Sequence, residues 1–246
     1  MPDSPETSAR GRRIAAFHAV LCVVALAGLI LGAIDTAGDS DPQSAATRFE
    51  RFFSYFTILS NIAILAVSAL LVKRPLIENR TWNVIRVTAL MSIAITGLIY
   101  LIVLRPDAHL EGSVEVIGNA LRHYVVPPLA LIGWMAFGPW PRQSWRDLGW
   151  VMLWPLLFGA FTMLHGAITG WYPYDFLDVD QHGYASVAVE LLITMLEMAA
   201  IAAIVLALNR RWSHSPAEMQ RWLSVSRTPV RNKGFATPES RHSSPR

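Results

Sequence analysis

Residues 52–72 read FFSYFTILSNIAILAVSALLV, a run of 21 residues that contains no charged side chain. At 1.5 Å per residue, a helix of this length spans roughly the 30 Å hydrocarbon core of a bilayer. Because lipid offers the backbone no hydrogen-bond partner, such a run must be helical. Ser54, Thr57 and Asn61 share one face of that helix. The stretch therefore predicts a transmembrane helix whose polar face turns toward other helices.

Apolar runs of this kind recur along the 246-residue chain, which is 53% hydrophobic and only 16% charged. Its mean hydropathy is +0.36, whereas a soluble domain has roughly 25% charged residues. The sequence predicts an all-α integral membrane bundle of six transmembrane helices over 14–208, between a basic arm at 1–13 and a basic, largely disordered tail at 209–246. The six spans are expected at about 14–34, 52–72, 84–104, 119–138, 148–170 and 185–208.

The distribution of charge predicts how the bundle is oriented. Seventeen of the 21 basic residues lie on one side of the predicted bundle: in the two terminal segments, in the loop between the second and third spans, and in the loop between the fourth and fifth spans. The other side holds ten acidic residues and four arginines. The positive-inside rule then places both termini in the cytoplasm and the protein in the cell membrane. The excess of basic residues is explained by the orientation of the protein in the membrane and does not indicate a nucleic-acid site. Membrane lipids are therefore the expected partners. A single cysteine, Cys22, excludes a disulfide framework and cysteine-ligated metal sites, and no metal or cofactor is expected.

Polar side chains within the spans mark the candidate site, because they are costly in lipid and face the bundle interior. Thr57, His165 and Glu190 each lie five residues from the outer end of their predicted spans, and His123 lies at a similar depth. These positions predict a polar pocket in the outer half of the membrane. The aromatic segment 171–175 is expected to cap it as an interfacial belt. The remaining candidates are Ser54, Asn61, Asn119 and Arg122.

Each candidate also has a purely structural interpretation. A membrane threonine such as Thr57 commonly donates to a carbonyl of its own helix, and Ser54 and Asn61 are typical interhelical hydrogen-bonding residues. Arg122 can extend to the headgroups, and His165 can be a core histidine. A neutral, hydrogen-bonded Glu190 is equally compatible with the sequence.

Two motifs resemble those of a known family. The segments Phe53-Ser-Tyr-Phe-Thr-Ile-Leu-Ser-Asn61 and Leu121-Arg-His-Tyr-Val-Val-Pro-Pro128 are similar to stretches of the androgen-induced-gene membrane proteins. This family includes the androgen-dependent TFPI-regulating proteins and six-span bacterial relatives. Trp171-Tyr-Pro-Tyr174 resembles a segment of the bacterial branch. The resemblance covers about residues 50–205.

The resemblance implies an activity, because animal members are threonine hydrolases of fatty acid esters of hydroxy fatty acids. It implies that Thr57 is the nucleophile and His123 its base, acting on a lipid ester. Ser54, Asn119 or Arg122 would then stabilise the oxyanion. Glu190 is the intramembrane candidate for orienting the histidine, and Asn61 and His165 complete the supporting set.

Two other classes of function remain open from the residues alone. His123 and His165 at similar depth on two spans can ligate a haem from both faces. A non-catalytic transporter or regulator is the other alternative, with Glu190 and Glu197 as ion sites and the basic tail as a signalling segment.

Overall fold

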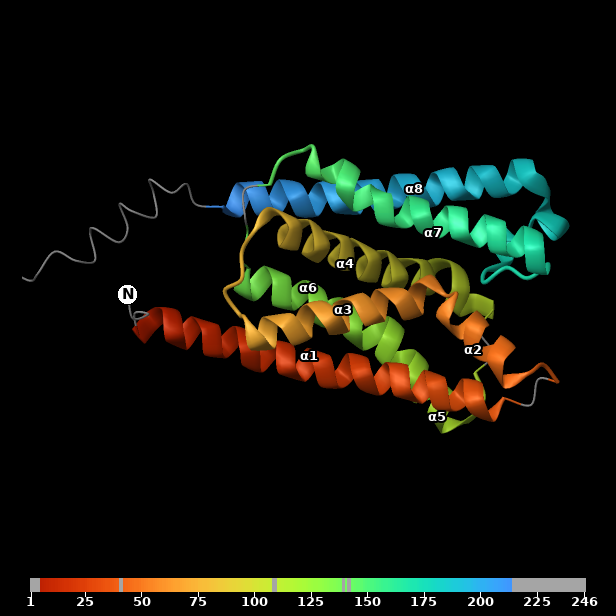
Figure 1. Ribbon diagram of the computed structural model, residues 1–246, viewed down its shortest axis with the longest axis horizontal. Coiled ribbons are helices and arrows are strands. Elements are labelled where there is room, and N and C mark those ends of the chain that lie inside the picture. The colour runs from red at the N-terminus through yellow and green to blue at the C-terminus, as the bar shows by residue number, and fades with distance from the viewer. Residues whose placement is uncertain (1–4, 40–41, 108–109, 139, 141–142, 214–246) are drawn as a thin grey trace, which may run out of the picture. The chain divides into compact units, whose positions relative to one another are not determined.

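The computed structural model describes residues 5–39, 42–107, 110–138, 140 and 143–213, and every regular element within them is helical (Figure 1). The predicted all-α bundle is therefore confirmed. The α-helices are α1 (Pro5–Gly38), α2 (Ala45–Phe53), α3 (Phe56–Lys73), α4 (Arg80–Ile99), α5 (Gly112–Ala120), α6 (Val126–Phe137), α7 (Asp147–Thr169) and α8 (Val179–Trp212). Short helical turns also occur: the π-helical η1 (Tyr100–Leu104) and η3 (Leu121–Val125), and the 3-10 turns η2 (Arg105–Asp107) and η4 (Asp175–Leu177).

Five helical segments in the described residues are long and apolar enough to cross a membrane, so the chain is a membrane protein. They are Ala9–Gly38, Phe56–Lys73, Arg80–Leu104, Asp147–Thr169 and Val179–Trp212. The further span expected at 119–138 corresponds to part of α5, η3 and α6 in direct succession. Pro127 and Pro128 provide no backbone N–H at the junction of η3 and α6, so no single long α-helix covers this segment. A sixth crossing stays a prediction.

Helix α4 lies at the centre of the bundle. It packs against α3, α6, α7 and α8, and Figure 1 shows it between the α7–α8 pair and the group formed by α1, α3 and α6. Its side chains Met91, Ile93 and Ile95 are at most 1% exposed. A largely apolar helix that contacts four neighbours is typical of a bundle core.

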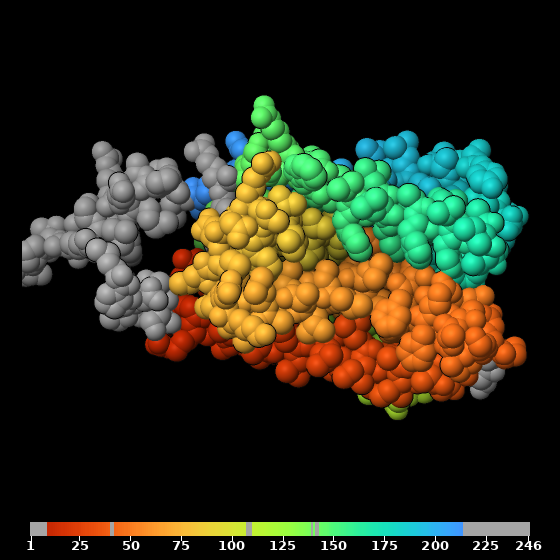
Figure 2. Space-filling model, viewed as in Figure 1, coloured from red at the N-terminus to blue at the C-terminus, as the bar shows by residue number. Residues whose placement is uncertain are grey.

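The outer surface of the bundle is apolar, as a lipid-facing surface should be. On α1, Ile14, Leu21 and Ala25 face the core and are at most 1% exposed, whereas Val23 is 68% exposed. On α7, Ile168 is 75% exposed. Figure 2 shows that α1, α3 and α7 cover this face of the molecule. The buried stripe of each outer helix therefore packs on the core while its other apolar side chains are available to lipid.

Small residues let α1 approach the η3 turn closely. A Cβ at Gly28 would lie 3.1 Å from Leu121 Cβ, and a Cβ at Gly32 would overlap the Arg122 guanidinium. Gly28 and Gly32 are four residues apart and share one face of α1, the spacing that permits close helix contacts in membranes. Gly97 on α4 similarly accommodates Pro127, which would lie 3.0 Å from a Cβ at that position.

The connection between α7 and α8 is folded back onto the bundle. Gly170 ends α7 in the left-handed region with φ of 67°. Tyr172 and Leu177 are then buried together with Val179 and Val187 of α8. This small apolar cluster anchors the connection and so fixes Tyr174 between its buried neighbours.

Helix α8 differs from the predicted last span at both of its ends. Gly183 has φ of 75° and interrupts the helix near its start, so the regular membrane helix begins close to the expected residue 185. At the other end the helix continues to Trp212, four residues into the predicted tail. The rest of that tail, 214–246, lies outside the described residues.

Two glycines of α7 provide a matched test of how tightly the 170–178 connection is held. A Cβ at Gly166 would overlap the buried Tyr172 ring, whereas a Cβ at Gly149 would meet nothing within 4 Å. We expect Gly166→Ala to destabilise the protein by about 1–3 kcal/mol, the usual range for overpacking. Gly149→Ala should be neutral or slightly stabilising. Unfolding of both variants in detergent measures the difference, and equal effects would show that the connection is loosely packed.

Candidate functional site

A polar cavity of about 410 Å³ lies between α1, the start of α3, the two π-helical turns and the α7–α8 connection. Its lining combines charged, aromatic and hydroxyl side chains, which is the composition expected of a binding site. The residues of the lining that carry polar or aromatic groups are Asp35, Thr36, Phe52, Tyr55, Thr57, Tyr100, Glu115, Asn119, Arg122, His123, Tyr174 and Asp175.

The two π-helical turns contact each other in the lining of this cavity. The ring of Tyr100 in η1 stacks on the ring of His123 in η3, with centroids 3.8 Å apart and planes at 23°. The Asn119 side chain donates to the Tyr100 hydroxyl at 2.5 Å. Single π-helical turns within helices are frequent at functional sites, since the extra residue redirects side chains. Here the two irregular turns bring three polar side chains from two distant segments into contact.

His123 has an unused ring nitrogen. The residue is 8% exposed, and its ring has a hydrogen bond with the backbone of Thr96. The Nδ1 atom is buried and lacks a partner among the described residues. A buried polar atom without a partner costs free energy and calls for an explanation. A nitrogen that accepts a proton or a ligand hydrogen bond during function provides one.

Thr57 lies in the first turn of α3, beside Tyr174. The Tyr174 hydroxyl lies close to the Thr57 side chain and to the backbone of Thr57 and Phe56. Both residues belong to the first turn of α3, whose N-cap residue Tyr55 offers no side-chain bond. Burial raises the pKa of Tyr174 to about 12, so its phenol stays protonated at neutral pH and can itself donate.

Arg122 and Asn61 tie the segments of the site together. The Arg122 guanidinium donates to the Gly28 carbonyl at 2.7 Å and so crosses from η3 to α1. The fully buried Asn61 side chain donates to the Thr57 carbonyl at 2.9 Å and reaches the Arg122 carbonyl at 3.5 Å. Asn61 therefore links the α3 segment that contains Thr57 to the turn that contains His123.

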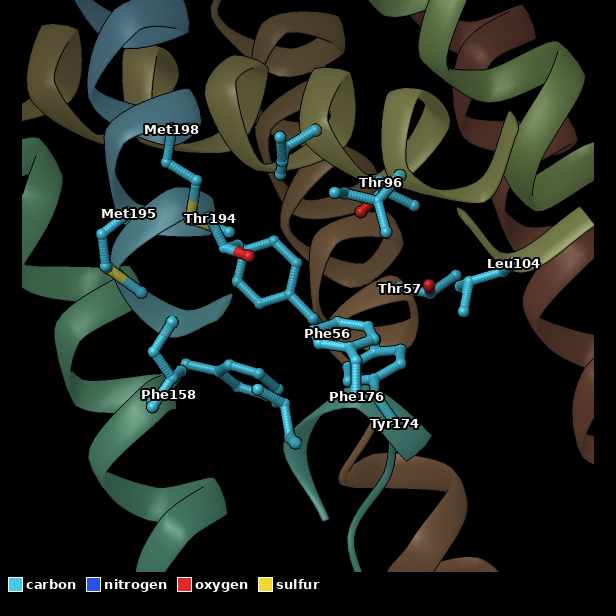
Figure 3. Close-up of a pocket in the computed structure, with 15 residues that line it drawn as sticks. Phe56, Thr57, Thr96, Leu104, Phe158, Tyr174, Phe176, Thr194, Met195 and Met198 are labelled. Atoms are coloured by element: carbon cyan, nitrogen blue, oxygen red, sulfur yellow. The ribbon is translucent and has the colours of Figure 1, made fainter. Parts of the chain in front are cut away.

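A second, apolar cavity of about 60 Å³ adjoins the polar one. Thr57, Leu104 and Tyr174 line both cavities. The apolar cavity continues between α4, α7 and α8, and Figure 3 shows Thr57 and Leu104 on one side of it, opposite Phe158 and Met195. The Thr57 side chain therefore lies where a polar space and an apolar space meet.

The structure brings together four of the sequence-predicted site residues and separates the others. Thr57, Asn119, Arg122 and His123 line the polar cavity. Ser54 is buried just before α3, where its hydroxyl donates to the Glu50 carbonyl at 2.9 Å. Asn61 does not line the cavity, but its side chain contacts the carbonyls of Thr57 and Arg122.

His165 and Glu190 lie outside both cavities. His165 of α7 pairs with Glu50 of α2, with Nε2 and Oε1 2.5 Å apart, and its ring stacks on Phe161. Glu190 is a half-buried residue of α8. Neither side chain lines the space occupied by His123, so the structure pairs His165 with a carboxylate rather than with the second histidine, and it gives Glu190 no place beside the His123 ring.

Several lining residues escaped the sequence reasoning. Tyr100 stacks on His123, Tyr174 lies beside Thr57, and Asp35 and Glu115 contribute charge to the same cavity. Their sequence positions at helix ends and in a connection are typical of interfacial belts and solvated loops. Only the aromatic segment that contains Tyr174 gave a signal, since it was expected to cap the pocket.

Comparison of the chain with protein-family models, curated proteins and solved structures finds no match.

Asn61 offers a test of how the site is held together. We expect Asn61→Ala to destabilise the protein by about 1 kcal/mol, because the substitution removes a hydrogen bond between segments in an apolar environment. Ser60 is equally buried, but its hydroxyl donates at 2.7 Å to the Phe56 carbonyl of its own helix. Ser60→Ala should therefore have a smaller effect. Unfolding in detergent compares the two, and a larger loss for Ser60→Ala would contradict the linking role of Asn61.

Proposed function

We propose that this membrane protein is a hydrolase of lipid esters, with Thr57 as the nucleophile and His123 as its general base. The observation that carries this proposal is the position of Thr57 at the junction of an apolar and a polar cavity, with His123 lining the polar one. An ester of a fatty acid has the same two-part character, since an acyl chain meets a polar linkage at the scissile carbonyl. Membership of the androgen-induced-gene family is part of this proposal.

The chemistry follows from groups that line the cavity. His123 takes the proton of the Thr57 hydroxyl while the oxygen attacks the ester carbonyl, which forms an acyl-threonine and expels the alcohol oxygen. His123 returns the proton to that alcohol. Water entering the polar cavity then attacks the acyl-threonine with the same base, and releases the fatty acid and free Thr57.

Stabilisation of the oxyanion is available at the start of α3. The Tyr174 hydroxyl, which is protonated at neutral pH, lies beside the first turn of α3. Preorganised donors of this kind stabilise the negative charge that develops on a carbonyl oxygen. We assign the Tyr174 phenol to the oxyanion; of the other candidates, Asn119 and Arg122 line the same cavity and Ser54 does not. Thr57, His123 and Tyr174 then form the reacting group.

The substrate and the orientation are further parts of the proposal. The family resemblance favours esters of hydroxy fatty acids as substrates, bound from the lipid phase. The positive-inside rule favours cytoplasmic termini in the cell membrane, so the polar cavity opens on the opposite, acidic side of the membrane.

Covalent labelling tests the nucleophile. We expect a fluorophosphonate probe to label the full chain in membranes and Thr57→Ala to abolish the labelling, because the attacking oxygen is lost. Thr57→Ser should retain it. His123→Gln should slow labelling by about 10²–10⁴-fold, the usual contribution of a general base. Gel fluorescence over time measures all four proteins.

Thr88 supplies the matched control for this labelling experiment. Its hydroxyl donates to the Val84 carbonyl at 3.0 Å, and it lies on α4 away from both cavities. Thr88→Ala should be labelled like the unmodified chain. Labelling that persists in folded Thr57→Ala would remove this residue from the role of nucleophile.

Cysteine accessibility tests the orientation. In a Cys22→Ala background, a cysteine replaces either Lys73 or Asp180, which are both exposed and lie at the two ends of the bundle. We expect a membrane-impermeant maleimide to modify Asp180→Cys on intact cells, and Lys73→Cys only after the cells are lysed. The reverse pattern would overturn the proposed orientation and leave the site chemistry untouched.

A further inference from the structure

An apolar groove of about 640 Å³ runs along the surface of the bundle between α3, α4 and α7. Helix α4 forms its floor, because it packs against both α3 and α7, and its Ala89 side chain is 2% exposed. Leu153 and Leu157 of α7, which are 44% and 57% exposed, lie at its edge. On the α3 side the lining includes two small residues, Ala63 and Ala66. The groove is therefore accessible from the lipid phase, and small side chains give it its depth.

The groove continues the apolar cavity that begins at Thr57. On each of the three helices, its last lining residue lies within one helical turn of a residue that lines the cavity. The pairs of neighbours, in the order α3, α4 and α7, are Leu59 and Thr57, Ser92 and Ile95, and Leu157 and Phe158. Since all three helices pass from one space to the other, the groove and the cavity lie end to end along the bundle.

Two phenylalanine rings lie where the groove meets the cavity. Phe56 of α3 and Phe158 of α7 pack edge to face, with ring centroids 4.9 Å apart and planes at 65°. Both line the apolar cavity but not the groove, and Figure 3 shows both side chains pointing into the cavity. Phe158 is only half-buried, so its ring can change rotamer without repacking the bundle core. The pair therefore separates the two spaces with a movable side chain.

The size of the cavity limits what it can hold by itself. Its volume is about 60 Å³, whereas an apolar cavity that binds benzene has roughly 150 Å³. Only a short acyl chain therefore fits between Thr57 and the phenylalanine pair. The groove extends along α3 as far as Leu70, which lies roughly 20 Å from Thr57 at 1.5 Å per residue. A lipid acyl chain spans about 15 Å, half of the hydrocarbon core, so cavity and groove together accommodate one.

We infer that the acyl chain of the ester substrate extends from Thr57 past the Phe56–Phe158 pair into the groove, and that this pair controls which chain lengths are accepted. This inference rests on the proposed hydrolase function and refines its substrate class to esters of long acyl chains. The chain enters sideways from the lipid, through the exposed side of the groove. The alcohol portion of the ester then occupies the polar cavity, and acyl transfer to Thr57 is unchanged.

Esters of one alcohol with different acyl chains test the groove on the full chain in nanodiscs. The substrates are p-nitrophenyl butyrate, octanoate and palmitate, and Ala66→Trp fills the groove with an indole. We expect this variant to lower the ratio of kcat/KM for the palmitate ester to that for the butyrate ester about tenfold or more, the usual effect of displacing methylenes from an apolar site. The octanoate ester should fall in between. Ala200→Trp is the control, because Ala200 is an exposed residue of α8 that lines neither space.

The same assay tests the phenylalanine pair. Phe158→Ala removes one ring from the boundary, so we expect the palmitate-to-butyrate ratio of kcat/KM to rise several-fold. Phe161→Ala is the matched control, since Phe161 lies on the same helix and lines neither space, and it should leave the ratio unchanged. If Ala66→Trp and Phe158→Ala both leave the ratio unchanged while hydrolysis still depends on Thr57, the inference is overturned and the hydrolase function stands.

Photo-crosslinking supplies a readout that needs no hydrolysis. The Thr57→Ala protein in nanodiscs is irradiated with palmitate that carries a diazirine at the end of its chain, and mass spectrometry maps the modified residues. We expect saturable labelling of Leu153 or Leu157, which excess palmitate displaces and Ala66→Trp weakens. Leu196 of α8 is 61% exposed and lines neither space, so its labelling reports nonspecific contact with the probe and should not saturate.

This readout separates a failure of the inference from a failure of the proposed function. If no ester is hydrolysed and no fluorophosphonate label forms, the hydrolase proposal fails, yet saturable labelling of the groove would still support an acyl-chain site there. Labelling of the groove that fails to saturate, as at Leu196, would overturn the inference.

Discussion

In the interior of a bilayer, an unpaired backbone N–H or C=O group costs several kcal/mol, and no water is present to relieve it. The long apolar segments of this protein are helical because a helix satisfies those groups within one segment. The bundle departs from the regular α-helical pattern at the π-helical turns η1 and η3. Each of these turns buries one ring, that of Tyr100 in η1 or His123 in η3, and the two turns together form one wall of the polar cavity.

Close packing of small residues makes this arrangement possible. Gly28 and Gly32 bring the backbone of α1 against η3, and Gly97 brings α4 against Pro127. As a result, the Arg122 guanidinium finds a carbonyl partner on a different helix, and the Tyr100 ring can lie flat on His123. The polar side chains of the cavity are thus held by apolar contacts around them, which explains how a membrane bundle can keep so many hydrogen-bonding groups in its interior.

Much of the fold is predictable from hydropathy, because span length and backbone satisfaction leave few alternatives. The all-α class follows directly, and the helical segments that contain Thr57 and His123 were located from sequence. The π-helical turns were not predicted, since hydropathy does not distinguish a π-helical turn from an α-helical one. The division of 119–138 into α5, η3 and α6 reflects Pro127 and Pro128, which provide no backbone N–H at the junction of η3 and α6. For the site, polar side chains within spans identified Thr57, Asn119, Arg122 and His123.

The remaining site residues depend on tertiary structure. Tyr174 reaches the cavity only because Tyr172 and Leu177 are buried and hold the α7–α8 connection against the bundle. No spacing in the sequence predicts this arrangement. His165 has the residue type and the predicted depth of a site residue, but it pairs with Glu50 of α2 instead. Asp35 and Glu115 are ordinary helix-end acids until α1 and α5 bring them to one cavity.

The two cavities that share Thr57 have a consequence for how the protein relates to the membrane around it. A lipid bilayer orders amphiphiles by means of its own headgroup boundary, whose depth varies with lipid composition and thickness. In this protein a comparable boundary is built into the interior by fixed side chains, with Thr57, Leu104 and Tyr174 lying along it. Under the proposed function, an amphiphile that enters would be aligned by the protein rather than by the leaflet. Its position relative to Thr57 would then not depend on the thickness or composition of the surrounding lipid.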